Sequence, residues 1–350
     1  MFQKHERKLL NDILELHDTL GTTATAKVES VKCRRILLAR KTIVCRGGMT
    51  KEKVLNEVAH LDRLNHAHIV RVIGTYVFGA ELAILLYPVA DWNLEGFLGL
   101  MNDECPTDYS RSMAAACRDF FVCLSNAVHF MHENLTKHMD IKPQNILVKR
   151  RRRPRSEDAA DQMHAYTVLI ADFGISRSYD SMEAAETDGI TSFTRRYAAP
   201  EVIKQEARGL PADIFSLGCV FLEMYLCLVD GELQPDLLSL HSRADKCADG
   251  VNAILKSNLG NDASYQANLC RLSDYLMYYD LIDHELSSPP GPRSWLRSVI
   301  LKVRELVPRM IQEQPKHRPT AADLRNAFGI GANCCDGGPY DLEVDVDDRY

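Results

Sequence analysis

The sequence has no Cys-x-x-Cys pair, although it contains 11 cysteines among its 350 residues. The cysteines are odd in number and scattered, and Cys334 and Cys335 are the only adjacent couple. This usage is typical of reduced thiols in a cytosolic or nuclear protein. Because the paired spacing that is usual in zinc sites is missing, we expect no zinc ligation.

Positive net charge and a membrane-spanning run are also missing. The formal net charge of −6 gives no general attraction to nucleic acid or to acidic membranes. The first ten residues lack the apolar core of a signal peptide. The longest apolar run, Ile214 to Val229, is interrupted by Glu223 and is short for a membrane span, so we expect a buried helix there. With 46% hydrophobic and 26% charged residues, the composition is that of an ordinary globular protein.

Polar residues that suit phosphate and metal chemistry gather in two short loops. In the stretch from His138 to Val148, Asp140 can accept a hydroxyl proton and Lys142 can face a phosphoryl oxygen. Asn145 in the same stretch and Asp172 in Ala-Asp-Phe-Gly offer oxygen ligands of the kind that Mg²⁺ prefers. Each residue alone would be an ordinary turn or cap residue, but their occurrence together and in order favours a catalytic site.

The order of these motifs resembles that of eukaryotic protein kinases of the serine/threonine type. The residues from His138 to Asn145 match the catalytic loop with one departure, and Asp-Phe-Gly and Ala199-Pro200-Glu201 follow in the family's order. The resemblance implies an α+β, two-lobed kinase fold over residues 16–328, with an N-lobe of antiparallel sheet and one main helix (about 16–88) and a mainly helical C-lobe (about 89–328). It leaves an N-terminal extension, residues 1–15, and an acidic tail, residues 329–350, for which we expect disorder. In the extension, the spacing of the apolar residues from Phe2 to Leu16 predicts a short helix: Leu9, Leu10, Ile13, Leu14 and Leu16.

The resemblance also implies an ATP site and its residues. Lys41 would contact the α- and β-phosphates, with Glu57 as its partner, and Gly21 would belong to the glycine-rich loop. Thr23 and Ala26 stand at the loop's other glycine positions, which predicts a poorer fit to the phosphates. The expected adenine contacts come from apolar side chains and from the hinge backbone: Val28, Ala39, Leu147, the carbonyl of Tyr87 and the N–H of Val89.

In the catalytic loop, the resemblance makes Asp140 the base, Lys142 the charge-balancing group, and Asn145 and Asp172 the ligands of Mg²⁺, with Mn²⁺ as an alternative. Further matches have structural roles: Asp213 would brace the catalytic loop, Arg318 would pair with Glu201, and Leu61, Val72, His138 and Phe173 would form a column between the lobes. Met139 replaces the usual arginine, which binds an activation-segment phosphate; a residue other than arginine also occurs here among fungal kinases. Activity should therefore not depend on such a phosphate.

A basic stretch, Lys149 to Arg155, opens a predicted insertion at residues 149–161. We interpret it mainly as a solvated loop, with a docking site for an acidic partner or an import receptor as the alternatives. The expected function is phosphoryl transfer from Mg-ATP to a protein serine or threonine, in the cytoplasm or nucleus. Its rivals are a pseudokinase scaffold and, more remotely, a nucleic-acid binder acting through the basic loop; no membrane association is expected.

Overall fold

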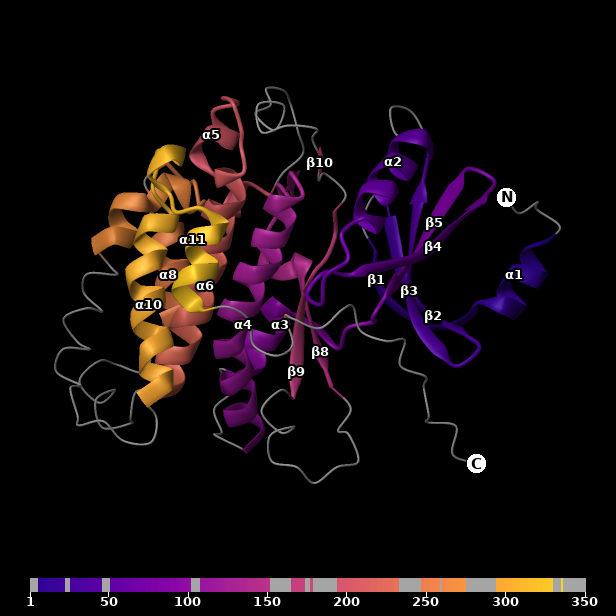
Figure 1. Cartoon of the computed structure of the whole chain (residues 1–350), viewed down its shortest axis with the longest axis horizontal. Helices are drawn as coiled ribbons and strands as arrows, with labels where there is room; N and C mark the ends of the chain where they lie inside the picture. The colour runs from indigo at the N-terminus through magenta and orange to yellow at the C-terminus, as the bar shows by residue number, and fades with distance from the viewer. Residues whose placement is uncertain are drawn as a thin grey trace.

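The computed structural model describes residues 6–22, 26–45, 51–101, 108–151, 165–173, 177–178, 194–232, 247–258, 260–274, 294–329 and 335. Figure 1 shows a sheet-rich lobe formed by the first part of the chain beside a larger lobe made mostly of helices. The predicted two-lobed α+β architecture is therefore confirmed.

The smaller lobe is built on a five-stranded antiparallel sheet with the order β1-β2-β3-β5-β4. Its elements are β1 (Glu15–Thr22), β2 (Ala26–Cys33), β3 (Ile36–Val44), α2 (Lys51–Asp62), β4 (Arg71–Phe78) and β5 (Glu81–Tyr87). Helix α2 packs on the sheet through Val54 and Val58, which share an apolar cluster with Ile43 and Ile84. The sequence from Ile36 to Val44 predicts a strand, and β3 has these bounds.

The N-terminal helix is shorter than the sequence pattern predicts. Helix α1 spans Arg7–Ile13 and β1 begins at Glu15, so the extension to residue 15 and the inclusion of Leu16 were wrong in detail. Leu10 and Leu14 are buried against the sheet with Val31, whereas Leu16 is exposed. The strand prevails because β1 pairs with β2 along its length.

The larger lobe surrounds one apolar helix. Its elements are α3 (Leu94–Met101), α4 (Asp108–Glu133), α5 (Pro200–Ile203), α6 (Pro211–Glu232), α8 (Cys247–Lys256), α10 (Ser294–Met310) and α11 (Ala321–Phe328), with short 3-10 turns at Pro143–Asn145, Arg195–Tyr197, Gln266–Asn268 and Pro315–His317. The 18-residue window Pro211–Leu228 of α6 is apolar enough for a membrane span, but 89% of it is buried within the protein. Helix α6 is thus a core helix, as predicted.

Short strands join the two lobes behind the predicted site. Strands β6 (Trp92–Asn93), β8 (Ile146–Arg150) and β9 (Tyr166–Ile170) form a three-stranded sheet, and β7 (Thr136–Lys137) pairs with β10 (Arg177–Ser178). The bridge between Ile69 and Ile170 connects this region to the turn that precedes β4.

The boundary predicted for the basic insertion, residues 149–161, needs correction. Lys149 and Arg150 are strand residues of β8 that pair with β9. The Lys149 ammonium also donates a hydrogen bond of 3.0 Å to the carbonyl of Val89. Ladder pairing and this contact make the first residues of the basic stretch part of the fold, and residues 152–164 lie outside the described part.

Candidate active site

The two predicted metal ligands are brought together by a pair of strands. Asn145 directly precedes β8, and Asp172 follows β9 by two residues. In the ladder Ile146 pairs with Ile170, and the N–H of Ala171 donates to the carbonyl of Asn145 at 2.9 Å. Because antiparallel partners keep this register to the end of the ladder, both side chains lie at the same end of the sheet.

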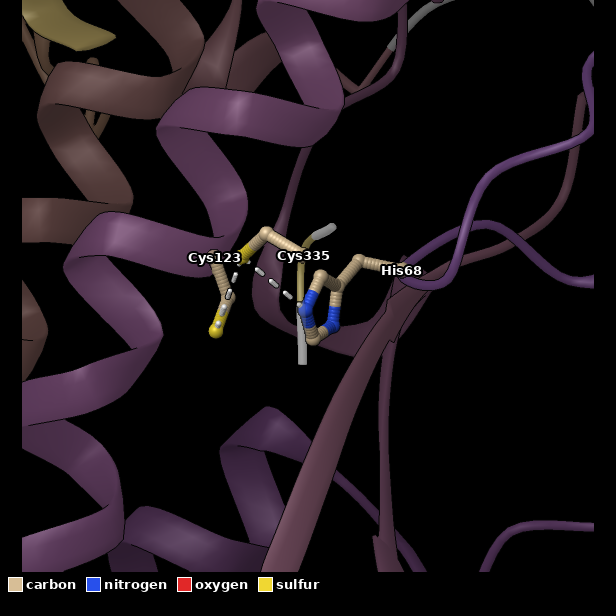
Figure 2. Close-up of side chains that lie close together, drawn as sticks. All are labelled: His68, Cys123 and Cys335. Carbon is tan, nitrogen blue, oxygen red and sulfur yellow. Dashed lines mark hydrogen bonds between the residues drawn. The ribbon is translucent and has the colours of Figure 1, made fainter. Parts of the chain in front are cut away.

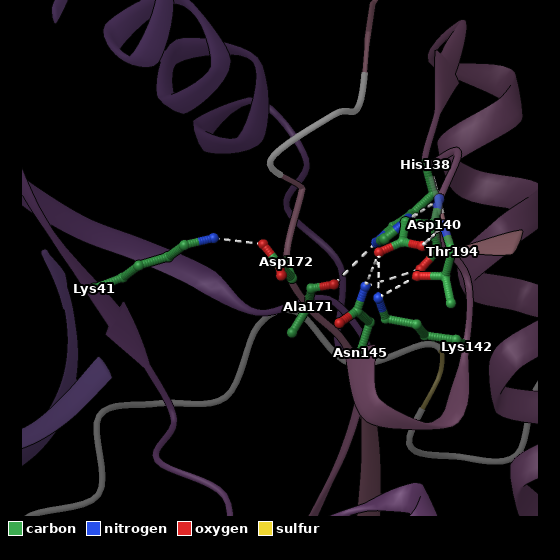
Figure 3. Close-up of polar contacts among 8 residues, drawn as sticks. All are labelled: Lys41, His138, Asp140, Lys142, Asn145, Ala171, Asp172 and Thr194. Carbon is green, nitrogen blue, oxygen red and sulfur yellow. Dashed lines mark hydrogen bonds and ion pairs between the residues drawn. The ribbon is translucent and has the colours of Figure 1, made fainter. Parts of the chain in front are cut away.

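The predicted catalytic residues form one hydrogen-bonded group. The Lys142 ammonium donates to Asp140 Oδ2 and to Thr194 Oγ1, each at 2.6 Å. The Asn145 amide donates to the same carboxylate oxygen and to the carbonyl of Asp140, both at 2.9 Å. The backbone N–H of Thr194 donates to Asp140 Oδ1 at 3.2 Å. Figure 3 shows this group around the Asp140 carboxylate, so three donors orient the predicted base.

Buried Asp213 braces the backbone of the catalytic loop, as predicted. Its two carboxylate oxygens accept from the N–H groups of His138 and Met139, each at 2.8 Å. Met139 has a φ of 69°, a left-handed conformation that a methionine rarely adopts, so the loop needs such support. Burial by itself raises the pKa of Asp213, but the His132 hydrogen bond and the contacts with His138 and Met139 hold it below its ordinary value.

His138 links the catalytic loop to the Asp-Phe-Gly loop. Its Nε2 lies 2.9 Å from the carbonyl of Ala171, and its ring lies 4.8 Å from that of Phe173, centroid to centroid. A carbonyl only accepts, so Nε2 carries the proton and Nδ1 accepts from the N–H of Asp140 at 3.3 Å. Leu61 packs against both main apolar clusters, and Val72 is buried in the smaller one. The predicted column thus begins in one lobe and ends in the other.

Lys41 crosses between the lobes. It lies on β3, and its ammonium forms an ion pair with Asp172, as Figure 3 shows. Burial raises the pKa of Asp172, but the charge and hydrogen bond of Lys41 outweigh it and hold that pKa below its ordinary value. Glu57, the predicted partner of Lys41, lies in α2, but its side chain is outside the described part of the structure, so that pair stays a prediction.

The predicted adenine contacts lie on neighbouring strands. Val28 pairs with Lys41 in the β2–β3 ladder, and Ala39 pairs with Leu86 in the β3–β5 ladder. Leu147 and Leu86, from different sheets, both pack against Val70, Leu169 and Ala171. The structure therefore places these apolar side chains on both sides of the junction between the lobes.

The remaining nucleotide residues lie on the sheet edge and the hinge. Gly21 pairs with Val28 on exposed strand β1, and a Cβ added at Gly21 would meet no atom within 4 Å. Tyr87 ends β5, and Val89 follows it between the lobes. The residues between β1 and β2, including Thr23, lie outside the described part.

The Glu201–Arg318 pair predicted from the sequence is buried and bidentate, with N–O distances of 2.6 and 2.8 Å.

The sequence analysis did not predict a second polar cluster, which surrounds Glu223 in α6. Glu223 accepts from the hydroxyls of Tyr197 at 3.0 Å and Tyr265 at 2.7 Å, and Arg196 contacts it at 3.3 Å. The interruption of an apolar helix by a single glutamate was the available signal for this partly buried anchor of the segment before Ala-Pro-Glu.

Comparison with known proteins agrees with this geometry. The protein kinase domain family matches residues 14–327. This chain belongs to the protein kinase family. Its relatives include the calcium/calmodulin-dependent protein kinase type 1 of Caenorhabditis elegans, 30% identical over 210 residues, which are 59% of this chain and 54% of that protein. The serine/threonine-protein kinase nekl-2 of the same organism is 28% identical over 206 residues, 56% of this chain and 52% of that protein.

A fungal relative matches more of the chain. The calcium/calmodulin-dependent protein kinase cmkA of Emericella nidulans is 27% identical over 293 residues, 83% of this chain and 64% of that protein. The chain spans about half the length of nekl-2 and of the type 1 kinase, and less than two thirds of cmkA. The similarity is thus to the kinase domains of serine/threonine kinases.

The residues present fit ATP and Mg²⁺, which this family generally uses. The side chain of Asp172 is half exposed, and the Lys41 ammonium contacts its Oδ1. Asn145 supplies an amide at the same end of the strand pair, and a carboxylate with an amide is a donor set that Mg²⁺ accepts. Lys41 supplies the positive charge that a phosphate needs beside it.

Proposed function

We propose that this chain transfers the γ-phosphoryl group of Mg-ATP to a serine or threonine hydroxyl of a protein. The observation that carries the proposal is the hydrogen-bonded group of Asp140, Lys142 and Thr194 beside the Lys41–Asp172 ion pair. Lys142 stands two residues after the predicted base, where serine/threonine kinases have a lysine and tyrosine kinases do not, and its ammonium donates a hydrogen bond to Thr194 Oγ1. This supports the serine/threonine branch.

In this proposal each residue has a separate task. Asp140 orients the substrate hydroxyl and accepts its proton, and Lys142 balances the charge that develops on the transferring group. Asn145 and Asp172 hold the metal ion, whose chemistry is to neutralise the phosphate oxygens, and Lys41 positions the phosphates. Positioning and fixed charges supply most of the rate acceleration in such a site.

The test uses the purified full chain with radiolabelled ATP, Mg²⁺ or Mn²⁺, and a generic acceptor such as myelin basic protein. Label should enter the acceptor only with the metal, and acid hydrolysis should release it as phosphoserine or phosphothreonine. Phosphotyrosine as the main product would refute the serine/threonine assignment. Any variant compared in this activity assay should keep both Glu201 and Arg318, because their buried ion pair supports the fold.

A scaffold without catalysis is the second candidate, and one observation favours it. Of the three glycine positions in the predicted phosphate loop, only Gly21 is a glycine. A pseudokinase would show a thermal shift with Mg-ATP but no turnover above the Asp140→Asn variant. The retained group of Lys41, Asp140, Asn145 and Asp172 favours the enzyme, because these polar groups supply charge and metal ligands, whereas small side chains in the loop only worsen a fit.

We further propose that the basic stretch after Arg151 acts in docking to an acidic partner or to an import receptor, and not in catalysis. Deleting residues 152–155 removes Arg152, Arg153 and Arg155 and tests this without removing Lys149, whose ammonium donates to the Val89 carbonyl. Turnover of the generic acceptor should stay unchanged while nuclear accumulation of a fluorescent fusion falls. A tenfold fall in turnover, or an unchanged distribution in the cell, would count against the proposal.

A further inference from the structure

Away from the catalytic group, three potential metal ligands from distant parts of the chain meet. His68 lies in the turn between α2 and β4, Cys123 lies in the middle of α4, and Cys335 follows α11 by seven residues. Figure 2 shows the imidazole and the two thiols gathered at one point beside α4. Their ligand atoms all lie within 4.8 Å of one another.

Two of the three distances between these atoms match those around a tetrahedral zinc ion. Cys335 Sγ lies 3.9 Å from Cys123 Sγ and 3.4 Å from His68 Nε2. With Zn–S of about 2.3 Å and Zn–N of about 2.0 Å, tetrahedral angles give S–S of about 3.8 Å and S–N of about 3.5 Å. The ligand atoms of Cys123 and His68 lie within 4.8 Å of each other, so an ion could be bound once these two side chains move slightly closer.

The imidazole already has the orientation that metal binding requires. His68 Nδ1 lies 2.8 Å from the carbonyl of Val168, and because a carbonyl only accepts, Nδ1 carries the proton. Nε2 in the neutral ring is then the atom with the free lone pair, and it is the atom that faces Cys335. A backbone carbonyl that fixes the other nitrogen is the usual support of a metal-binding histidine.

The three side chains are held by the fold. His68 is 1% exposed and Cys123 is 3% exposed, and the N–H of Ile170 donates to the carbonyl of His68 at 2.8 Å. Cys335 is half-buried and packs against the main apolar cluster. Two ligands are thus buried in the fold, one in a turn and one in α4, and the third follows the last helix.

We propose that His68, Cys123 and Cys335 bind a zinc ion that fastens the segment after α11 to both lobes. Two thiolates and one imidazole form a donor set that selects zinc over Mg²⁺ or Ca²⁺, and water takes the fourth position. Binding releases the two thiol protons to solvent, and no electron is transferred. The turn that carries His68 also pairs with β9, which leads to Asp172, so the zinc ion lies behind the active site and does not take part in it.

Sequence spacing could not reveal this site, because 55 residues separate His68 from Cys123 and 212 residues separate Cys123 from Cys335.

The test is the zinc content of the full chain, purified from zinc-supplemented cells and dialysed against metal-free buffer. We expect about one zinc per chain. In Cys335→Ser the content should fall at least tenfold, whereas the exposed Cys270→Ser control should keep it. Cys335→Ser is the decisive variant because a half-buried position outside the helices tolerates serine better than the buried Cys123.

Cobalt substitution identifies the ligands independently of activity. Co²⁺ added to the metal-free chain should give a thiolate-to-cobalt absorption band in the wild type and in Cys270→Ser, and a much weaker band in Cys335→Ser and Cys123→Ser. A zinc chelator should lower the Tm of the wild type but leave that of Cys335→Ser unchanged. Zinc retained by Cys335→Ser, absence of zinc from the wild type, or a Cys123–Cys335 disulfide found by mass spectrometry would each overturn the proposal.

Discussion

The two sides of the catalytic cleft are fixed to very different degrees. On the C-lobe side, His138 and Asp213 are completely buried, and Asp140 receives hydrogen bonds from three different residues. On the N-lobe side, every residue of β1, from Glu15 to Thr22, is exposed. This strand is the edge of its sheet, and its register with β2 is irregular at two places.

The two sides of the cleft are restrained differently because they have different functions. Proton acceptance and metal binding need side chains fixed to a fraction of an ångström, and the hydrogen bonds to the Asp140 carboxylate and to buried Asp213 supply that. A strand that covers a nucleotide must let it enter and leave, and an edge strand with one neighbour is the less restrained element. Changes on the C-lobe side should therefore affect rate and stability together or rate alone, and changes on the N-lobe side should affect ATP affinity.

The largest expected effect is on the chemical step. Asp140→Asn should lower kcat by about 10²–10⁴-fold, because the amide has nearly the shape of the carboxylate but cannot accept the hydroxyl proton. Single-turnover assays with radiolabelled ATP measure this. Asp172→Asn should be as damaging, but it should also weaken Mg-ATP binding in a thermal-shift titration, whereas Asp140→Asn should not. If the wild type turned over ATP no faster than either variant, the proposed kinase activity would be refuted.

The next effect is on stability. Arg318→Ala should lower the free energy of unfolding by about 3–5 kcal/mol, because it leaves the Glu201 carboxylate buried without its partner. Urea denaturation followed by circular dichroism measures the change.

Lys204→Ala is the matched control, because the Lys204–Glu313 pair is also an ion pair between the same two chain regions but is solvent-exposed on both sides. That substitution should leave the denaturation midpoint unchanged. Equal effects of the two substitutions would show that burial of the Glu201–Arg318 pair does not decide its strength.

Asp213→Asn should cost about 1.5–3 kcal/mol at neutral pH, because one of the two oxygens that accept from the backbone becomes an NH₂ donor and the remaining hydrogen bond is neutral. The pKa of Asp213 is lowered in the folded state, so its contribution to stability is present above the unfolded pKa of about 3.9 and is lost as the pH falls through the folded pKa. The stability difference between wild type and variant should thus be largest near pH 7 and shrink in acid. A difference that grows toward acid pH would contradict the assigned charge.

Two glycines test the same contrast at a smaller scale. A Cβ at Gly218 would lie 2.8 Å from Met310 Cβ and 2.9 Å from Ile311 Cγ2, because α6 and α10 are in close contact there. Gly218→Ala should lower the free energy of unfolding by about 1–2 kcal/mol, since overpacking outweighs the gain in helix propensity.

Gly21→Ala should leave the Tm unchanged, because the space around Gly21 is open. It should raise the KM for ATP by less than about tenfold, or about 1.4 kcal/mol. The opposite pattern, with Gly21→Ala destabilising and Gly218→Ala neutral, would reverse the assignment of rigid and adaptable sides.

The sequence predicted those parts of the site that its motifs contain. Asp213 and Arg318 could be assigned partners more than 70 residues away because their motifs resemble those of known kinases, and the observed hydrogen bonds agree. Lys149 was placed in a solvated loop, since a run of like charges is usually solvated and only the fold reveals the Val89 carbonyl within its reach.

Other contacts depend on three-dimensional arrangement alone. The cluster around Glu223 joins residues 196, 197, 223 and 265, and no short pattern connects them. In the N-terminal helix, periodicity identified the helix but not its buried face, because the neighbouring strand β1 determines where the helix ends. Local signals thus predict an element, and long-range packing sets its bounds.

The smallest expected effect concerns the activation segment, whose residues 174–176 and 179–193 lie outside the described part. Met139 has no donor for a phosphate there, and Arg195 and Arg196, which follow the segment, already have hydrogen-bond partners. Arg195 pairs with Asp262 at 2.6 Å, and Arg196 contacts Asn252 at 2.7 Å as well as Glu223. Phosphatase treatment should therefore change kcat by less than about twofold, since the charge-assisted bond, worth about 1.5–3 kcal/mol, is not made.

Met139→Arg is the converse variant, because it restores the missing donor next to the base. If a phosphate is present on the activation segment, activity of Met139→Arg should become sensitive to phosphatase while that of the wild type stays insensitive. Met139→Leu controls for the loss of the thioether in a side chain that packs against the main apolar cluster. A large and reversible loss of wild-type activity on dephosphorylation would show instead that Arg195 or Arg196 exchanges its present partner for the phosphate, and Arg195→Ala and Arg196→Ala would then identify which one does.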